Sequence, residues 1–193
     1  MMRKTLLAVL VSGLMVTGVQ AAENQVNGYL FGNVGQADYD FGKAFKGAPG
    51  SLDEKDTAFK VGAGVQLNPY VAVEFQWVDL GEATYKEPGY KGLASIDGYG
   101  ANIVGTLPLD RFKLYGKVGY HKLEMEVKGK DDFWDDWSAS EKDWITSYAV
   151  GATYMLTPQF EVGAEYERYD DVADKFDVNV DVDLASLTLR YNF

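Results

Sequence analysis

Cysteine is absent from the 193 residues, so neither disulfides nor thiol chemistry is available to this chain. Stability has to come from hydrogen bonding and packing, which suits a closed sheet whose strands are all paired. Basic residues are also scarce, with 18 Lys and Arg against 29 Asp and Glu and a net charge of −11. A surface of this sign disfavours nucleic acid as a partner, because phosphates bind Lys and Arg.

Long apolar runs are lacking beyond the first 21 residues. There, Arg3 and Lys4 precede the mostly apolar stretch Thr5–Val16, and Val19–Ala21 offers small residues for cleavage. We interpret residues 1–21 as a signal peptide and residues 22–193 as one domain without a linker. Removing the two basic residues from 18 leaves 16 against 29 acidic ones, a net charge near −13.

What the chain does have is strict alternation, clearest in Asp183–Phe193. Apolar residues fall on one face and polar residues on the other, and the stretch finishes on an aromatic residue in the apolar register. The apolar face holds Ala185, Leu187, Leu189, Tyr191 and Phe193, and the polar face holds Ser186, Thr188, Arg190 and Asn192. Such an ending fits the closing strand of a transmembrane β-barrel.

Seven further segments show a similar pattern. With the last one, the predicted strands are Gly28–Tyr39, Thr57–Leu67, Tyr70–Asp79, Tyr99–Leu107, Phe112–His121, Trp144–Leu156, Phe160–Glu167 and Asp183–Phe193. Three short proline-containing turns alternate with four long polar segments, near 40–56, 81–97, 122–143 and 170–181. We therefore predict an all-β fold, an eight-stranded antiparallel up-and-down transmembrane β-barrel. A soluble sandwich has no reason for such alternation.

The first strand leaves its lipid-facing side open, because both of its registers are mixed. Its glycines are expected to leave room in a narrow barrel for long side chains opposite. Aromatic residues near the strand ends predict a belt at each membrane surface. These residues are Tyr70, Phe112, Phe160, Tyr191 and Phe193 beside the short turns, and Trp77, Tyr99, Tyr120, Trp144 and Tyr166 near the long segments.

Four stretches resemble the OmpA-like family of small outer-membrane barrels: Glu74–Gly81, Leu107–Leu109, Leu114–Tyr120 and Leu189–Phe193. The resemblance covers the mature chain and implies the outer membrane of a Gram-negative bacterium, with both termini periplasmic. It implies that Tyr191 and Phe193 belong to a terminal signal for the outer-membrane assembly machinery. We expect no peptidoglycan-binding domain of the kind that the longest members carry after the barrel.

Charged residues in the polar register are the sharpest candidate site. They are Lys60, Glu74, Lys117, Glu165 and Arg190, and they are expected to line the lumen in neighbouring layers. A charge in so narrow an interior is costly unless paired, so we expect ion pairs between the carboxylates and the cations. The pairs predict either a structural plug or, as an alternative, a gate for a narrow ion path.

The single histidine, His121, is expected to face inward near the outer rim. Some eight-stranded barrels modify lipid A through a His–Ser–acid site, but the sequence places no serine or acid beside His121. Asp177–Asp183 alternates valine with polar residues. We interpret it as the point where the apolar register turns inward above the lipid, or as a bulge that shifts the register.

The third long segment contains four carboxylates interleaved with aromatic residues. Asp131, Asp132, Asp135 and Asp136 could meet a divalent cation or lipopolysaccharide, although the ligand spacing of an EF-hand is absent and a solvated acidic loop is the simpler interpretation.

No nucleophile–base pair, phosphate loop or metal-ligand spacing was found, so we expect no enzyme activity, no cofactor and no metal. The sequence favours a monomeric envelope protein with a structural, envelope-integrity or surface-interaction role through acidic extracellular loops. Its expected partners are outer-membrane lipids, lipopolysaccharide and the assembly machinery. A narrow porin-like channel is the alternative, and a lipid A-modifying enzyme is a distant third.

Overall fold

The fold is given by a computed structural model, which describes residues 27–40, 51–53, 55–87, 90–131, 137–170, 172 and 180–193. The strands are β1 (Asn27–Asp40), β2 (Ser51–Asp53), β3 (Lys55–Asn68), β4 (Val71–Glu87), β5 (Tyr90–Leu109), β6 (Phe112–Asp131), β7 (Trp137–Met155), β8 (Phe160–Tyr169) and β9 (Asp181–Asn192). The predicted signal peptide and the side chains of Asp131, Asp132, Asp135 and Asp136 lie outside the described part.

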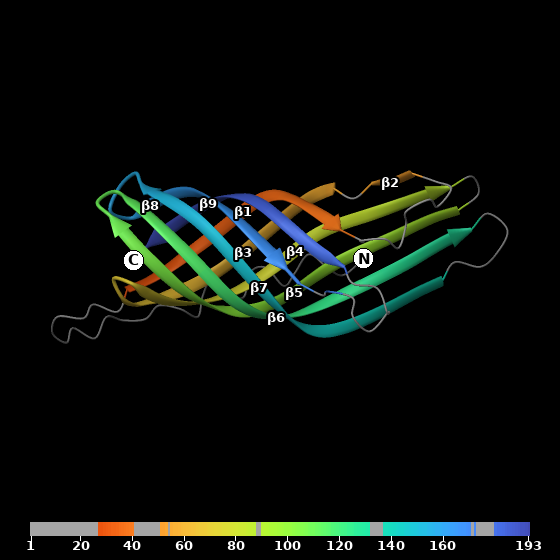
Figure 1. Cartoon of the computed structure of the whole chain (residues 1–193), viewed down its shortest axis with the longest axis horizontal. Helices are drawn as coiled ribbons and strands as arrows, with labels where there is room; N and C mark the ends of the chain where they lie inside the picture. The colour runs from red at the N-terminus through yellow and green to blue at the C-terminus, as the bar shows by residue number, and fades with distance from the viewer. Residues whose placement is uncertain are drawn as a thin grey trace.

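Eight of these strands form a closed antiparallel ring, as predicted. The order around the ring is β4-β3-β1-β9-β8-β7-β6-β5, and β4 pairs with β5 to close it. The short β2 stands outside the ring and pairs with β4, Leu52 opposite Tyr85. Figure 1 shows the strands crossing obliquely around the barrel. No helix in the described residues is long and apolar enough to cross a membrane.

One end of the barrel, called here the turn end, carries the tight connections β3–β4, β5–β6 and β7–β8. The middle one turns at Asp110, whose φ of 57° lies in the left-handed region, while Pro108 belongs to β5 and pairs with Lys113. Strand β1 starts and β9 finishes at this end, where the Phe193 amide donates to the Gly28 carbonyl at 3.0 Å. The opposite end is called the loop end.

Strand β1 has one definite inward face, which its mixed sequence had left undecided. Tyr29 and Phe31 are buried in the lumen, and Leu30 and Val34 face outward. Glycines opposite make room for the two rings, as expected: a Cβ on Gly64 would come within 2.2 Å of Tyr29, since these residues are register partners.

Most of two segments predicted as long loops is strand. Residues 81–87 and 90–97 extend β4 and β5, and residues 122–131 and 137–143 extend β6 and β7. In contrast, β8 stops at Tyr169 and β9 starts at Asp181. The four strands β4 to β7 therefore rise as a tall wall on one side of the barrel, as Figure 1 shows at its right.

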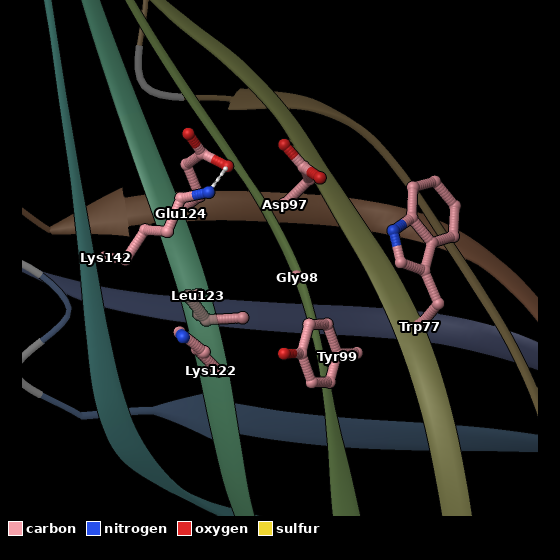
Figure 2. A pocket seen from close by; sticks show the side chains of 8 residues that line it. All are labelled: Trp77, Asp97, Gly98, Tyr99, Lys122, Leu123, Glu124 and Lys142. Atoms are coloured by element: carbon pink, nitrogen blue, oxygen red, sulfur yellow. Dashed lines mark ion pairs between the residues drawn. The ribbon is translucent and has the colours of Figure 1, made fainter. Parts of the chain in front are cut away.

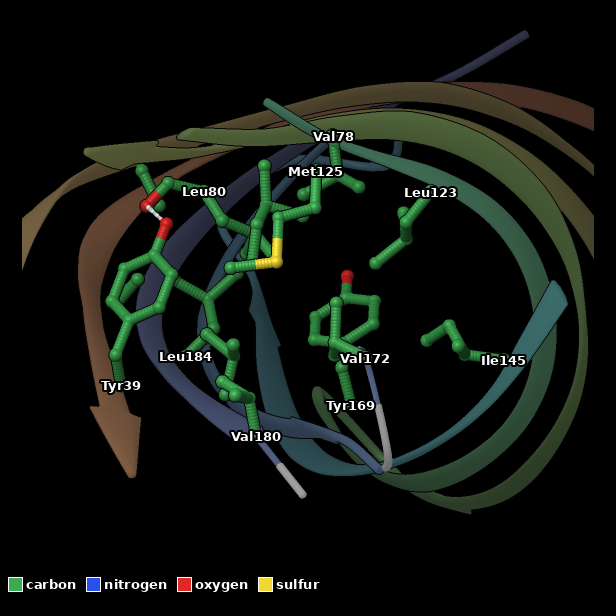
Figure 3. Close-up of a cluster of buried hydrophobic side chains, with 14 of the residues drawn as sticks. Tyr39, Val78, Leu80, Leu123, Met125, Ile145, Tyr169, Val172, Val180 and Leu184 are labelled. Carbon is green, nitrogen blue, oxygen red and sulfur yellow. Dashed lines mark hydrogen bonds between the residues drawn. The ribbon is translucent and has the colours of Figure 1, made fainter. Parts of the chain in front are cut away.

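The lumen at the loop end is filled by apolar side chains, which we call the apolar layer. Its largest members are Tyr39, Val78, Leu80, Ile96, Leu123, Met125, Ile145, Tyr169, Val172, Val180, Val182 and Leu184, most of them drawn in Figure 3. The Tyr39 hydroxyl donates to the Leu80 carbonyl at 3.0 Å. Val180, Val182 and Leu184 face inward as expected, and β9 pairs with both neighbours without a bulge.

The outer wall at mid-height is apolar and exposed, with Ile103 at 65% and Val150 at 64%. All ten aromatic residues predicted for the belts face outward and are exposed. Near the loop end Tyr120 stacks on Trp144, with ring centroids 5.0 Å apart. At the turn end Tyr191 contacts Phe160 and Phe193.

Candidate functional site in the barrel lumen

The five charged residues singled out from the sequence all lie buried in the lumen, between the turn end and the apolar layer. Lys117 contacts Glu74 and Glu165, at 2.7 Å each. Arg190 contacts Glu74 at 3.2 Å. Lys60, with no exposed side-chain area, pairs with Glu165. The structure therefore joins the five residues in one network, which we call the charged layer.

Three further charges belong to this layer and were not among the sequence candidates. Glu167 lies 2.5 Å from Lys60, and Glu161 lies 2.5 Å from Lys113. Both glutamates alternate with Glu165 in the inward register of β8, so strand parity alone could have identified them. With these additions the layer holds four cations and four carboxylates and is electrically balanced.

Neutral donors and aromatic rings complete the surroundings of these charges. The Tyr29 hydroxyl donates to Glu74 at 2.8 Å, and the Tyr115 hydroxyl donates to Glu165 at 2.9 Å. The Arg190 guanidinium stands 4.2 Å from the centre of the Tyr29 ring. Buried carboxylates need such donors, because water is not there to solvate them. The arrangement holds charge in place inside the barrel.

His121 lies deeper than predicted: it is fully buried between the charged and apolar layers and does not reach the rim. Its Nε2 atom is 3.0 Å from the Ser147 hydroxyl and 3.1 Å from the Asn102 side-chain oxygen. Ser147 in turn donates to Glu167 at 2.9 Å. The sequence could not place Ser147 or Glu167 here, because they come from different strands.

This trio is not arranged as a nucleophile with its base. Ser147 donates to Glu167 and the Asn102 side-chain oxygen can only accept, so these contacts assign the role of donor to His121 Nε2. A catalytic histidine would instead accept the serine proton, with the acid on its other nitrogen. His121 and Ser147 are also fully buried, out of reach of a substrate.

Outside the lumen, ion pairs raise the pKa of two cations on the outer face. The hydrogen bond to Glu124, at 2.9 Å, raises the pKa of Lys142 above its ordinary value. Hydrogen bonding to Asp181 and the charge of Asp183 raise the pKa of Arg168. Among the described residues, no group of three or more His, Asp or Glu side chains could hold a metal ion.

A closed antiparallel ring with an apolar outer wall, two aromatic belts and a polar, self-neutralising lumen defines a small outer-membrane β-barrel. The chain belongs to the outer membrane protein beta-barrel domain family, whose model matches residues 6–193. This membership, in line with the OmpA-like resemblance, places it in the outer membrane.

Two curated relatives support the assignment. Outer membrane protein P5 of Haemophilus influenzae is 29% identical over 184 residues, which cover 86% of this chain and 51% of the relative. Outer membrane protein A of Shigella flexneri is 27% identical over 200 residues, covering all of this chain and 56% of the relative. The chain thus spans about half the length of these relatives.

Solved structures show the same fold. The attachment invasion locus protein Ail of Yersinia pestis, solved with a heparin analogue, superposes with a TM-score of 0.60 at 18% identity, over 87% of this chain and 99% of that one. Neisserial surface protein A gives 0.62 at 16% identity, over 86% and 97%. At these identities the likeness concerns the fold alone.

Proposed function

We propose that the protein is a non-enzymatic barrel that contributes to the integrity of the outer membrane and meets other surfaces through acidic extracellular loops. The observation that supports this is the filled lumen. A balanced charged layer is followed by an apolar layer, so side chains occupy the interior where a pore would hold water. Neither layer offers a bound substrate a place to react.

The test is the barrier property of the envelope. Cells lacking the protein are expected to become more sensitive to detergent combined with a chelator, and the wild-type gene should restore resistance. A Lys60→Met barrel, weakened in the charged layer, should restore it poorly. Unchanged resistance in the deletion strain would refute the integrity role.

The acidic loop is the proposed contact for surfaces. Asp131, Asp132, Asp135 and Asp136 would share a divalent cation with lipopolysaccharide phosphates, since hard cations take carboxylate oxygens. The matched change is the fourfold Asp→Asn variant, with Asp110→Asn at the turn end as control. The loop variant should lose calcium-dependent attachment to lipopolysaccharide layers and the control should keep it.

A narrow channel is the second candidate, and one observation favours it. Glu74 and Glu165 each contact two cations, so partners could exchange without leaving a bare charge. If a gate exists, the refolded barrel conducts in a planar bilayer and Lys117→Ala or Glu74→Gln changes the trace. We expect little conductance in all three proteins, because the apolar layer blocks the same path. A wild-type conductance that these variants abolish would establish the gate.

A lipid A-modifying activity is the least supported alternative, given the orientation of Ser147 and His121. Mass spectrometry of lipid A from cells with and without the protein would detect it, and we expect identical acylation patterns.

The proposal includes a route of export and assembly for the barrel. We assign residues 1–21 to the signal peptide, both termini of the mature chain to the periplasm, and Tyr191 with Phe193 to the signal read by the assembly machinery, for a monomeric product. Deleting Phe193 should lower the amount of folded barrel in outer-membrane fractions, measured by the gel shift between unboiled and boiled samples. Normal assembly without Phe193 would contradict the assignment.

A further inference from the structure

A groove on the outside of the tall wall stands apart from the lumen. It has a volume of about 130 Å³ and is lined by residues of β4, β5, β6 and β7, chiefly Trp77, Asp97, Tyr99, Lys122, Glu124 and Lys142. Figure 2 shows it between the Lys142–Glu124 pair on one side and Trp77 on the other. Typical pockets for drug-sized ligands measure roughly 300–1,000 Å³, so this groove suits one polar headgroup fragment.

The strand register shows why the groove lies where it does. Trp77 pairs with Tyr99, Tyr99 with Lys122 and Lys122 with Trp144, which makes one row across four strands. The next row towards the loop end is Asp79, Asp97, Glu124 and Lys142. The groove therefore spans the step from the aromatic belt to the charged outer face, the level at which lipid headgroups meet a barrel.

Lys122 differs from its neighbour Lys142 in its electrostatic surroundings. Within the described part of the structure no carboxylate lies within 4.0 Å of its ammonium group, whereas Lys142 is held by Glu124 at 2.9 Å. Its neighbours in the row are the aromatic side chains of Tyr99 and Trp144. A cation in this setting is suited to an anionic group supplied from outside the protein.

We propose that the groove binds the phosphorylated sugar headgroup of lipopolysaccharide. The phosphate lies on Lys122, with Lys142 at the edge of the groove. The sugar ring packs on Trp77 and Tyr99, and its hydroxyls donate to Asp97 and Glu124. The acyl chains run along the exposed apolar wall below, over Phe75 and Ile103.

The lining favours a glycolipid over a phospholipid. The carboxylates of Asp97 and Glu124 can accept hydrogen bonds from sugar hydroxyls, and the flat faces of Trp77 and Tyr99 suit a sugar ring, which a phospholipid headgroup such as phosphatidylglycerol does not have. The assignment rests on the proposed envelope role and names the lipid that this role would engage.

Binding is measured by native mass spectrometry of the refolded full-length barrel in detergent. The probe is a defined bisphosphorylated lipid A, compared with its dephosphorylated form and with phosphatidylglycerol. The variants are Lys122→Gln and the control Lys128→Gln, which removes an outward lysine of the same strand about 20 Å further along. Both changes remove one lysine charge from the outer face of β6, but Lys128 lies outside the groove, where it is exposed and pairs with Glu126.

We expect one retained lipid A on the wild type and on Lys128→Gln, and about tenfold weaker retention on Lys122→Gln, as for loss of a charged hydrogen bond. Trp77→Leu should weaken retention of both lipid A forms. The dephosphorylated lipid should bind the wild type about as weakly as lipid A binds Lys122→Gln, and phosphatidylglycerol should bind least.

Equal retention of lipid A by the wild type and Lys122→Gln would overturn the proposal, as would equal retention of the two lipid A forms or preference for phosphatidylglycerol. Folding of each variant is checked by the gel shift. The proposed envelope role would be refuted by a different result, unchanged detergent resistance in the deletion strain. The two failures are therefore distinguishable.

Discussion

The charged layer and the apolar layer are built from the same strands but have opposite chemistry. Strand β4 contributes Glu74 to the first and Leu80 to the second, and β9 contributes Arg190 and Leu184. At the level of the charged layer the outer wall meets lipid and must be apolar, which leaves the lumen as the place for polar groups. Near the loop end the outer wall meets water, and the barrel has the apolar interior of a soluble protein.

The two layers should also respond differently to mutation. Removing one partner from the charged layer leaves an opposite charge buried without compensation. Removing atoms from the apolar layer leaves a cavity, whose cost depends on how far the neighbours relax.

The largest effect is expected for Lys60→Met. It leaves Glu165 and Glu167 without the cation they share, and the loss of folding free energy should be about 3–5 kcal/mol. Urea unfolding in lipid vesicles, followed by the gel shift, gives the value. Lys128→Met, which breaks a pair on the exposed face, should cost at most about 1 kcal/mol. Equal losses would mean that the charged layer is hydrated.

A smaller effect is expected for Leu80→Ala in the apolar layer. Leu80 is fully buried, and truncation to alanine in a packed core costs about 2–5 kcal/mol, the lower part of this range being expected near an open end. The same unfolding assay measures it. Ile103→Ala, on a side chain 65% exposed at mid-height, is the control and should cost less. A larger loss for Ile103 would mean that the apolar layer is loosely packed.

The smallest effect is expected for Glu124→Gln on the outer face. Because Glu124 raises the pKa of Lys142, the stability from this pair is present below the ordinary lysine pKa and is lost as pH rises through the raised value. Glu124→Gln should therefore lower the Lys142 pKa in an NMR titration above pH 10, with no measurable change in unfolding at neutral pH. An unchanged Lys142 pKa would show that solvent screens the pair.

The sequence predicts the ring and five of the eight charges of the charged layer because one rule, apolar outside and polar inside, holds throughout the membrane. The rule reverses near the loop end. In β6, Leu123 and Met125 face inward while Lys122 and Glu124 face outward. The pattern of apolar residues on the outward face of this strand therefore ends at His121. The pattern therefore predicts loops where the strands in fact continue, although it does predict the same reversal at Val180 and Leu184.

A local irregularity in β4 also limits what the sequence predicts. Between Asp79 and Glu82 the β4–β5 register shifts, with Gly81 at a φ of 80°, so Leu80 and Ala83 both face inward. An alternating pattern cannot be followed across such a bulge. The sequence also cannot predict which charged residues form ion pairs with each other. Lys60 on β3 reaches Glu167 on β8 across the lumen, and this contact depends on the stagger of the strands.

The seam between β1 and β9 has a consequence for the order of folding. Tyr29 pairs with Asn192 and Asp40 with Asp181, so the ring closes through residues that lie at opposite ends of the barrel sequence. No barrel can exist until the final strand has been delivered, and contacts this distant in sequence slow folding. Until β9 has paired with β1, the apolar outer-wall residues have no closed barrel to hold them against lipid and need protection from water.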